Sequence, residues 1–355
     1  ELHNLRISGA QDGVYLRNAA GIRLAGLDVF QCASNGLSMV ECGDLQVSHS
    51  RLWGNARYGY SMSAHQGAAG INQSTIWGNK LGGMYSDKGG MQVSNCILGV
   101  TNQTPIYVES GTAAFVGDYN LFELVAGSVI GTNQPGKTAY LNLSQWQILG
   151  RDTHSLVAPA WFAQPDAGNF HLLSRAGYLS NGVWRAADRT SWGIDAGDPL
   201  AAAWTNELPS NGNRINLGAH GGTPEASLSD SSVPELFAVS LRDGGVATNG
   251  QPLHWLYRGI NATNFLKIEY SPDGGANWIV VVTNLPAGSS PYPWVTMVDP
   301  TPEARWRITL MSNPGVYSET PTNFTLRTRS LTYYVNDSST NGDVYCQGLG
   351  IATNR

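Results

Sequence analysis

A short sequence pattern recurs about five times between residues 13 and 112, at a nearly constant period. Each copy opens with a glycine before an apolar residue, at positions 13, 36, 59 and 83, and proline takes the glycine place at 105. Repeats of this length, built from short alternating strands with Gly or Asn at the corners, predict a solenoid whose coils stack on one another.

Two aliphatic columns run in step with the glycine column. Side chains alternate in and out along a strand, so uniformly aliphatic columns should point inward and the residues one place further should point outward. The predicted inward columns are Val29, Leu52, Ile76 and Ile97, and Leu24, Val47, Ile71 and Val93. The column predicted to point outward, partly exposed, is Phe30, Trp53, Trp77 and Leu98.

The repeats resemble those of right-handed parallel β-helix (pectin-lyase-like) proteins, many of which are polysaccharide lyases, hydrolases or surface proteins. The segments SRLWGN and STIWGN resemble that family's turn, in which an Asn, here Asn55 and Asn79, enters an interior ladder. A leucine-rich repeat has a similar period, but its consensus is missing. The expected fold class is all-β: a right-handed parallel β-helix solenoid with a C-terminal cap, followed by an immunoglobulin- or fibronectin-like β-sandwich.

Composition limits the kinds of partner that the protein can bind and the roles that its cysteines can have. Only 13% of the residues are charged, 42 are glycine, and the net charge of −5 argues against a nucleic-acid partner and an anionic membrane surface. The sequence contains no apolar run of about 18 residues, so no membrane span is predicted. Cysteines 32, 42 and 96 have no metal-ligand spacing and are predicted to be packing residues, with Cys32 in the place of Asn55 and Asn79.

We place the domain boundaries where the repeat pattern and the local amino-acid composition change along the chain. We predict coils over 1–140, a capping region that closes the open end of the solenoid over 141–226, a linker over 227–233 and an immunoglobulin-like sandwich over 234–330. Within the sandwich, residues 271–278 match an Asp box, whose Asp273 is predicted to cap its own turn. Asp195 and Asp198 are candidate calcium ligands, but turn chemistry is the preferred interpretation, so no cofactor is expected and calcium is the alternative.

Residues 331–355 resemble the opening of another β-helix. The sequence also begins inside the repeat pattern. The two observations together predict that the sequence is one repeating unit of a large modular protein. The tail is expected to pair with a neighbouring module of the same chain or, as a head-to-tail homopolymer, with another molecule.

A β-helix lyase needs a basic residue beside a charge-neutralising cation on one outward face. The candidates in the coils are Arg57, His65, Lys80 and Lys88, with Arg57 and Lys80 one place apart in adjacent coils, although a solvated edge is the plainer interpretation. A glycosidase carboxylate pair is not visible in the repeats.

Three functions remain open. The preferred one is a non-catalytic structural or adhesive module of a bacterial extracellular or cell-surface protein. The alternatives are a polysaccharide lyase and a polysaccharide-binding solenoid that stacks sugars on Phe30, Trp53 and Trp77.

Overall fold

The computed structural model describes residues 1–65, 67–99, 104–108, 113–125, 128–133, 138–140, 142–295 and 299–327. Within these ranges the chain is almost entirely short strands, with one five-residue helix, α1 (Leu143–Gln147), and the 3-10 turns η1 (Pro165–Ala167), η2 (Ala202–Asn206) and η3 (Ala287–Ser289). The all-β prediction is confirmed. The predicted tail over 331–355, with Cys346, lies outside the described residues.

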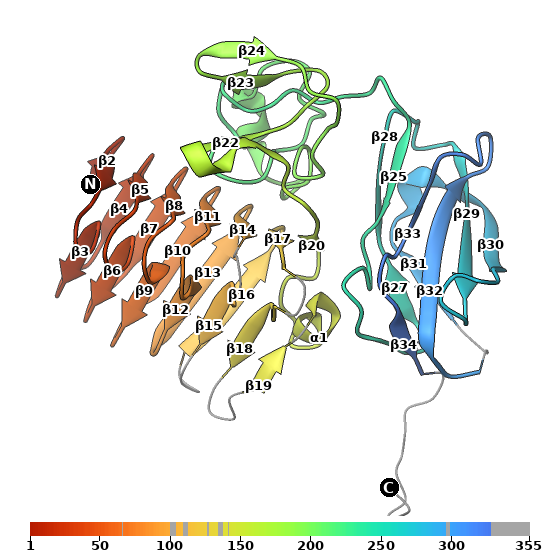
Figure 1. The fold of residues 1–355 in the computed structure, drawn as a ribbon, viewed down its shortest axis with the longest axis horizontal. Helices are drawn as coiled ribbons and strands as arrows, with labels where there is room; N and C mark the ends of the chain where they lie inside the picture. The colour runs from red at the N-terminus through yellow and green to blue at the C-terminus, as the bar shows by residue number, and fades with distance from the viewer. Residues whose placement is uncertain are drawn as a thin grey trace, which may run out of the picture.

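Three sheets wind together into the predicted parallel solenoid (Figure 1). Sheet A contains β1 (Leu2–His3), β4 (Ile22–Ala25), β7 (Leu45–Ser48), β10 (Ala68–Asn72), β13 (Gly89–Ser94) and β16 (Ala113–Asp118). Sheet B contains β2 (Arg6–Ser8), β5 (Asp28–Phe30), β8 (Arg51–Trp53), β11 (Thr75–Trp77), β14 (Ile97–Gly99), β17 (Leu121–Glu123) and β20 (Leu156–Val157). Sheet C contains β3 (Val14–Arg17), β6 (Leu37–Val40), β9 (Tyr58–Ser63), β12 (Gly82–Ser86), β15 (Ile106–Val108), β18 (Gly131–Asn133) and β19 (Thr138–Tyr140), whose last pair is antiparallel.

The glycine column marks the start of sheet C. A Cβ at Gly36 would stand 2.7 Å from the carbonyl oxygen of Gly59 in the next coil, so the stacking of coils requires a residue without a side chain there. The residues one place after the glycines pair from coil to coil, as predicted. The aliphatic residues of sheet A from Leu24 to Val93 also pair as predicted. The paired residues in sheet C are Val14, Leu37, Tyr60, Met84 and Ile106.

The predicted register fails by one residue at a single coil of sheet B. Ile76 pairs with Leu98, so Leu98 points into the core and Ile97 points outward beside Thr75. The predicted column placed Ile97 only 21 residues after Ile76, whereas the paired residues Ile76 and Leu98 are 22 residues apart, closer to the spacing of the other coils. Cys96 consequently lies at the corner with Ser74.

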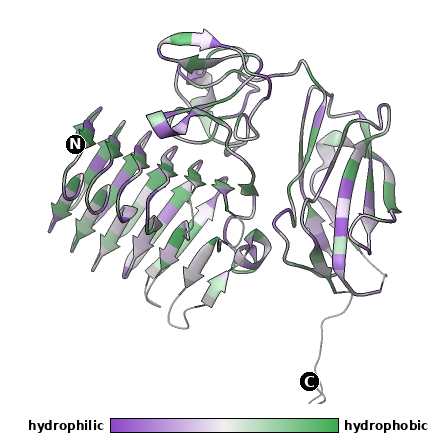
Figure 2. Ribbon diagram, in the orientation of Figure 1, coloured by the Kyte–Doolittle hydropathy of each residue, from purple (hydrophilic) through white to green (hydrophobic). Residues whose placement is uncertain are grey.

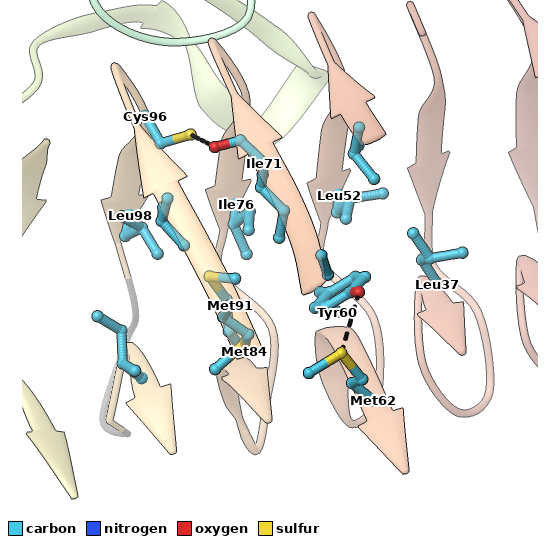
Figure 3. Packing of buried hydrophobic residues seen from close by; sticks show 14 of the residues in the cluster. Leu37, Leu52, Tyr60, Met62, Ile71, Ile76, Met84, Met91, Cys96 and Leu98 are labelled. Carbon is cyan, nitrogen blue, oxygen red and sulfur yellow. Dashed lines mark hydrogen bonds between the residues drawn. The ribbon is translucent and has the colours of Figure 1, made fainter. Parts of the chain in front are cut away.

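Apolar residues from all three sheets fill the solenoid interior, and Figure 2 shows hydrophobic positions recurring from coil to coil. Figure 3 shows Tyr60 within this core, where its hydroxyl lies 3.2 Å from the sulfur of Met39 and 3.6 Å from that of Met62. Burial raises the pKa of this phenol, so it stays neutral. Cys32, Cys42 and Cys96 are buried free thiols, as the packing interpretation predicts.

Segment 141–226 does not act as an end cap throughout, contrary to the prediction. Trp146 of α1 covers the last coil, and its indole N–H donates to Asp152 over 2.8 Å. The rest of the segment, residues 156–226, returns along the outer face of sheet B and is called the returning segment. There the backbone amides of Asp198 and Gly218 donate hydrogen bonds to Asn95 of a middle coil. This returning part contains β21 (Phe162–Gln164), β22 (Asn169–Leu172), β23 (Tyr178–Ser180) and β24 (Val183–Arg185).

The C-terminal strands enclose a second apolar core. One sheet has the order β26 (Val246–Ala247), β34 (Phe324–Leu326), β32 (Thr301–Leu310), β29 (Phe265–Ser271) and β30 (Ile279–Pro286), with β33 (Tyr317–Glu319) paired to β32. Two further pairs are β25 (Glu235–Ala238) with β28 (Trp255–Arg258), and β27 (Gln251–Leu253) with β31 (Tyr292–Trp294). Asp273 caps its turn as predicted, because its carboxylate accepts hydrogen bonds from Ser271 and Asn277.

The predicted linker over 227–233 is anchored to the returning segment. The Ser227 hydroxyl donates to the carbonyl of Leu172 over 2.6 Å, and the carboxylate of Asp230 accepts from Thr190 and Arg175. Burial acts to raise the pKa of Asp230, but hydrogen bonds from Ser232, Thr190 and Arg175 outweigh it and hold that pKa at about 2.

Candidate functional site

The aromatic column of sheet B points outward but is covered by the chain itself. Phe30 and Trp53 stack with ring centroids 4.7 Å apart, as a ladder predicts. Phe170 lies edge-on to Trp53 at 5.6 Å, and Phe162 lies edge-on to Trp77 at 4.9 Å. Trp53 is only 7% exposed, so the prediction of an exposed column is wrong for its central ring. A sugar cannot stack on Trp53 unless this cover moves.

The four candidate lyase residues fall at two separate corners of the solenoid. The Leu81 amide donates to the carbonyl of Arg57, which places Arg57 and Lys80 one residue apart in adjacent coils, as predicted. His65 lies beyond the other end of β9, beside Gly89, the residue after Lys88. A six-residue strand such as β9 spans about 20 Å. The candidates therefore form two distant pairs rather than one basic cluster.

Three of those four side chains are exposed, and only His65 is buried. Burial lowers the pKa of His65, which disfavours a charged imidazole at this corner. Neither corner contributes a lining residue to the two cavities described below.

Asp195 and Asp198 occupy the returning segment, and both carboxylates accept hydrogen bonds. Asp198 accepts from the amide of Leu200 over 2.9 Å, which is the turn chemistry preferred from the sequence. Asp195 accepts from the Ser229 hydroxyl over 2.8 Å, and burial raises the pKa of its carboxyl to about 6. Among the residues described by the structure, neither aspartate belongs to a group of three metal-ligating side chains.

A cavity of about 770 Å³ lies between the last coils, the returning segment and the C-terminal strands. Its size is that of a small-molecule site, and its wall mixes aromatic rings with charged groups. Polar lining residues include Tyr119, His154, Asp195, Arg214, His254 and Arg258.

One wall of the cavity contains the imidazole of His154, which contacts a carboxylate and two further rings. The Nδ1 atom of His154 lies 2.7 Å from the carboxylate of Asp118, whose other oxygen accepts from the His154 amide over 2.7 Å. The imidazole stacks on Tyr119 with centroids 4.8 Å apart. The ring of His254 meets it edge-on, and burial, with a smaller effect of His154, lowers the pKa of His254 to about 4.

Another part of the cavity wall carries Arg258 over the ring of Trp192, at 4.0 Å from the ring centroid. Burial lowers the pKa of this guanidinium to about 10, so it remains charged at neutral pH. A guanidinium beside aromatic rings suits a polar ligand with hydroxyl or carboxylate groups.

A second polar cluster lies where the returning segment crosses the middle coils. The imidazole rings of His171 and His220 stack with centroids 3.6 Å apart. An oxygen of Glu225 lies 3.7 Å from Nε2 of His171 and 3.4 Å from Nδ1 of His220. Burial lowers the pKa of both histidines, that of His171 to about 3, so both rings are neutral at pH 7.

His171 also lines a polar cavity of about 460 Å³ beside the first coils, together with Arg6, Asp28 and Arg51. Asp28 is nearly buried, accepts the indole N–H of Trp53 over 2.9 Å, and pairs with both arginines at 3.3 Å.

Sequence reasoning missed both cavities and the histidine cluster. His220 and Glu225 are only five residues apart, but His171 precedes His220 by 49 residues, and no local spacing connects it to the other two. The residues meet only because segment 156–226 returns along sheet B, which the repeat pattern cannot predict.

Comparison with known proteins supports the N-terminal part of this description. Residues 1–123 match the family model for the right handed beta helix region. No curated protein and no solved structure matches the sequence. No helix in the described part of the chain is long and apolar enough to cross a membrane. The first 123 residues are thus a parallel β-solenoid with the sequence signature of the right-handed β-helix family.

Proposed function

We propose that the chain is a structural or adhesive module of a large extracellular or cell-surface protein, with a solenoid that acts as a rigid body. The observation that supports this best is that the aromatic column of sheet B is buried inside the protein rather than exposed to a ligand. It packs into one apolar cluster that joins the coils, the returning segment and the C-terminal strands. In this cluster Trp53 comes from the coils, Phe170 from the returning segment and Phe237 from the C-terminal strands.

We further propose that the C-terminal strands form an immunoglobulin-like sandwich that serves as a spacer. Its contact with the rest of the chain supports a fixed arrangement. Trp192 stacks on Phe237 at 4.9 Å, Arg258 donates to the carbonyl of Ser191, and Asp243 accepts from the amide of Leu143.

Surface labelling tests the location that this function requires. Antibodies against the purified chain should label intact, unpermeabilised cells of the source organism or its culture medium. Labelling that appears only after cell lysis contradicts the proposal.

A second candidate function is saccharide binding in the 770 Å³ cavity, favoured by its aromatic and charged walls. His154 is the variant of choice because its side chain is 48% exposed within that wall. On a glycan array, a ligand of the wild-type chain should be lost or bound at least tenfold more weakly by His154→Gln. The control is His3→Gln in the first coil, whose side chain is 52% exposed. Equal binding by all three proteins removes this candidate.

A further inference from the structure

The histidine cluster leaves buried polar atoms without partners. Nε2 of His171 and Nε2 of His220 are both buried and have no hydrogen-bond partner. Unpaired buried polar atoms are rare in native proteins and point to an absent water or ion.

The hydrogen bonds around His171 fix which of its nitrogens carries the proton. The Oδ1 atom of Asn169 accepts from the His171 amide over 3.2 Å and lies 2.8 Å from Nδ1 of the same residue. An amide oxygen can only accept, so Nδ1 carries the hydrogen and Nε2 carries a lone pair. That lone pair lies 3.7 Å from a carboxylate oxygen of Glu225.

A lone pair next to a carboxylate is an unfavourable arrangement, and a bound cation or a water that donates to both atoms relieves it. Arg51 does not fill this role, because its guanidinium bonds Asp28 and the carbonyl of Gly168. We propose that His171, His220 and Glu225 bind a divalent transition-metal ion of the zinc class.

The donor atoms are close together, but the two imidazole planes are only 19° apart, so binding one ion through both rings requires the His220 ring to rotate out of the stack. One donor atom from each of the three residues lies within 4.8 Å of the other two. Bonds of 2.0–2.1 Å to a tetrahedral zinc ion place its ligands about 3.3 Å apart. Glu225 can supply the closing movement, since its side chain is 57% exposed while those of His171 and His220 are 11% and 16% exposed.

Two imidazoles and one carboxylate are a common ligand set for zinc and leave a fourth position for water. Asn169 takes the second-shell role, because it orients the His171 ring through Nδ1. The ion ties the loop that carries His220 and Glu225 to β22, and so holds the returning segment against the coils.

Cobalt titration of the full chain, stripped with a chelator, tests the site. Wild-type protein should bind one Co²⁺ with the visible absorption of tetrahedral coordination, and Zn²⁺ should displace it. Glu225→Gln and His220→Gln should abolish the signal, and Asn169→Ala should weaken binding about 10- to 100-fold. Zinc should also raise the melting temperature of the wild type but not of Glu225→Gln.

The controls are Glu303→Gln, an exposed residue far along the chain, and His3→Gln. Both should bind cobalt as the wild type does. Glu225 is exposed, so its substitution keeps the test interpretable even where His220→Gln fails to fold. An absence of binding at millimolar cobalt, or binding that Glu225→Gln leaves unchanged, overturns the proposal.

Discussion

Asn79 holds Asn55 of the preceding coil by two hydrogen bonds to one oxygen. Its Oδ1 atom accepts from the backbone amide of Asn55 over 3.0 Å and from the side-chain amide over 2.9 Å. Asn55 in turn accepts from the amide of Cys32, so the ladder crosses three coils. Both asparagines are completely buried, and the ladder satisfies groups that water cannot reach.

Asn79→Ala should therefore lower the free energy of unfolding by about 2–4 kcal/mol, because it leaves more than one buried polar group unpaired. Urea denaturation of the full chain measures this change. Asn261→Ala, at an exposed turn, is the matched control and should change stability little. An equal effect of both substitutions would show that the ladder contributes nothing special.

Phe170→Ala should destabilise the chain by about 3–5 kcal/mol, since it removes a fully buried ring from the cluster over sheet B. It should also admit water to Trp53, which Phe170 contacts edge-on. Urea denaturation measures the loss of stability. A red shift of tryptophan emission reports the entry of water. Phe265→Ala is the control, because that ring is 52% exposed and should cost far less.

The stability of the chain should respond to pH through Asp195. Its folded pKa, about 6, lies above the ordinary value of 3.8, so its stabilising effect is complete below pH 3.8 and is lost as pH rises to 6. Asp195→Asn keeps an oxygen that can accept from Ser229 and removes the charge. The variant should match the wild type near pH 4 and exceed it by about 2–3 kcal/mol near pH 8.

Urea midpoints at the two pH values check this, with exposed Asp166→Asn as control. A difference between Asp195→Asn and the wild type that stays constant from pH 4 to pH 8 would contradict the assignment.

Lyase activity on alginate, pectate or chondroitin should be absent. Arg57 and Lys80 lie at one corner of sheet C, and His65 and Lys88 lie at the other, so the four basic candidates do not form one cluster around a sugar. The ultraviolet absorbance of the unsaturated product measures activity, with a known lyase as positive control. Product formation that disappears in Lys80→Ala would show that one corner suffices.

Sequence alone determined the solenoid because each coil repeats the same local requirement. A glycine must pass close to the next backbone at Gly36, an aliphatic residue must enter the core at Leu52, and Asn79 must bond the preceding coil. Such requirements recur at a fixed period and are visible without coordinates. The one failure, at Ile97, occurred where the period shortens and the strand shifts by one residue.

Only the tertiary structure decided what covers the outward face and where polar groups converge. The alternation of strand residues predicted that Trp53 points outward, but not that Phe170 returns to cover it. The same return brings His171 to His220 and Glu225. These contacts join segments that share no repeat, and the burial of a large apolar surface selects them rather than any local spacing.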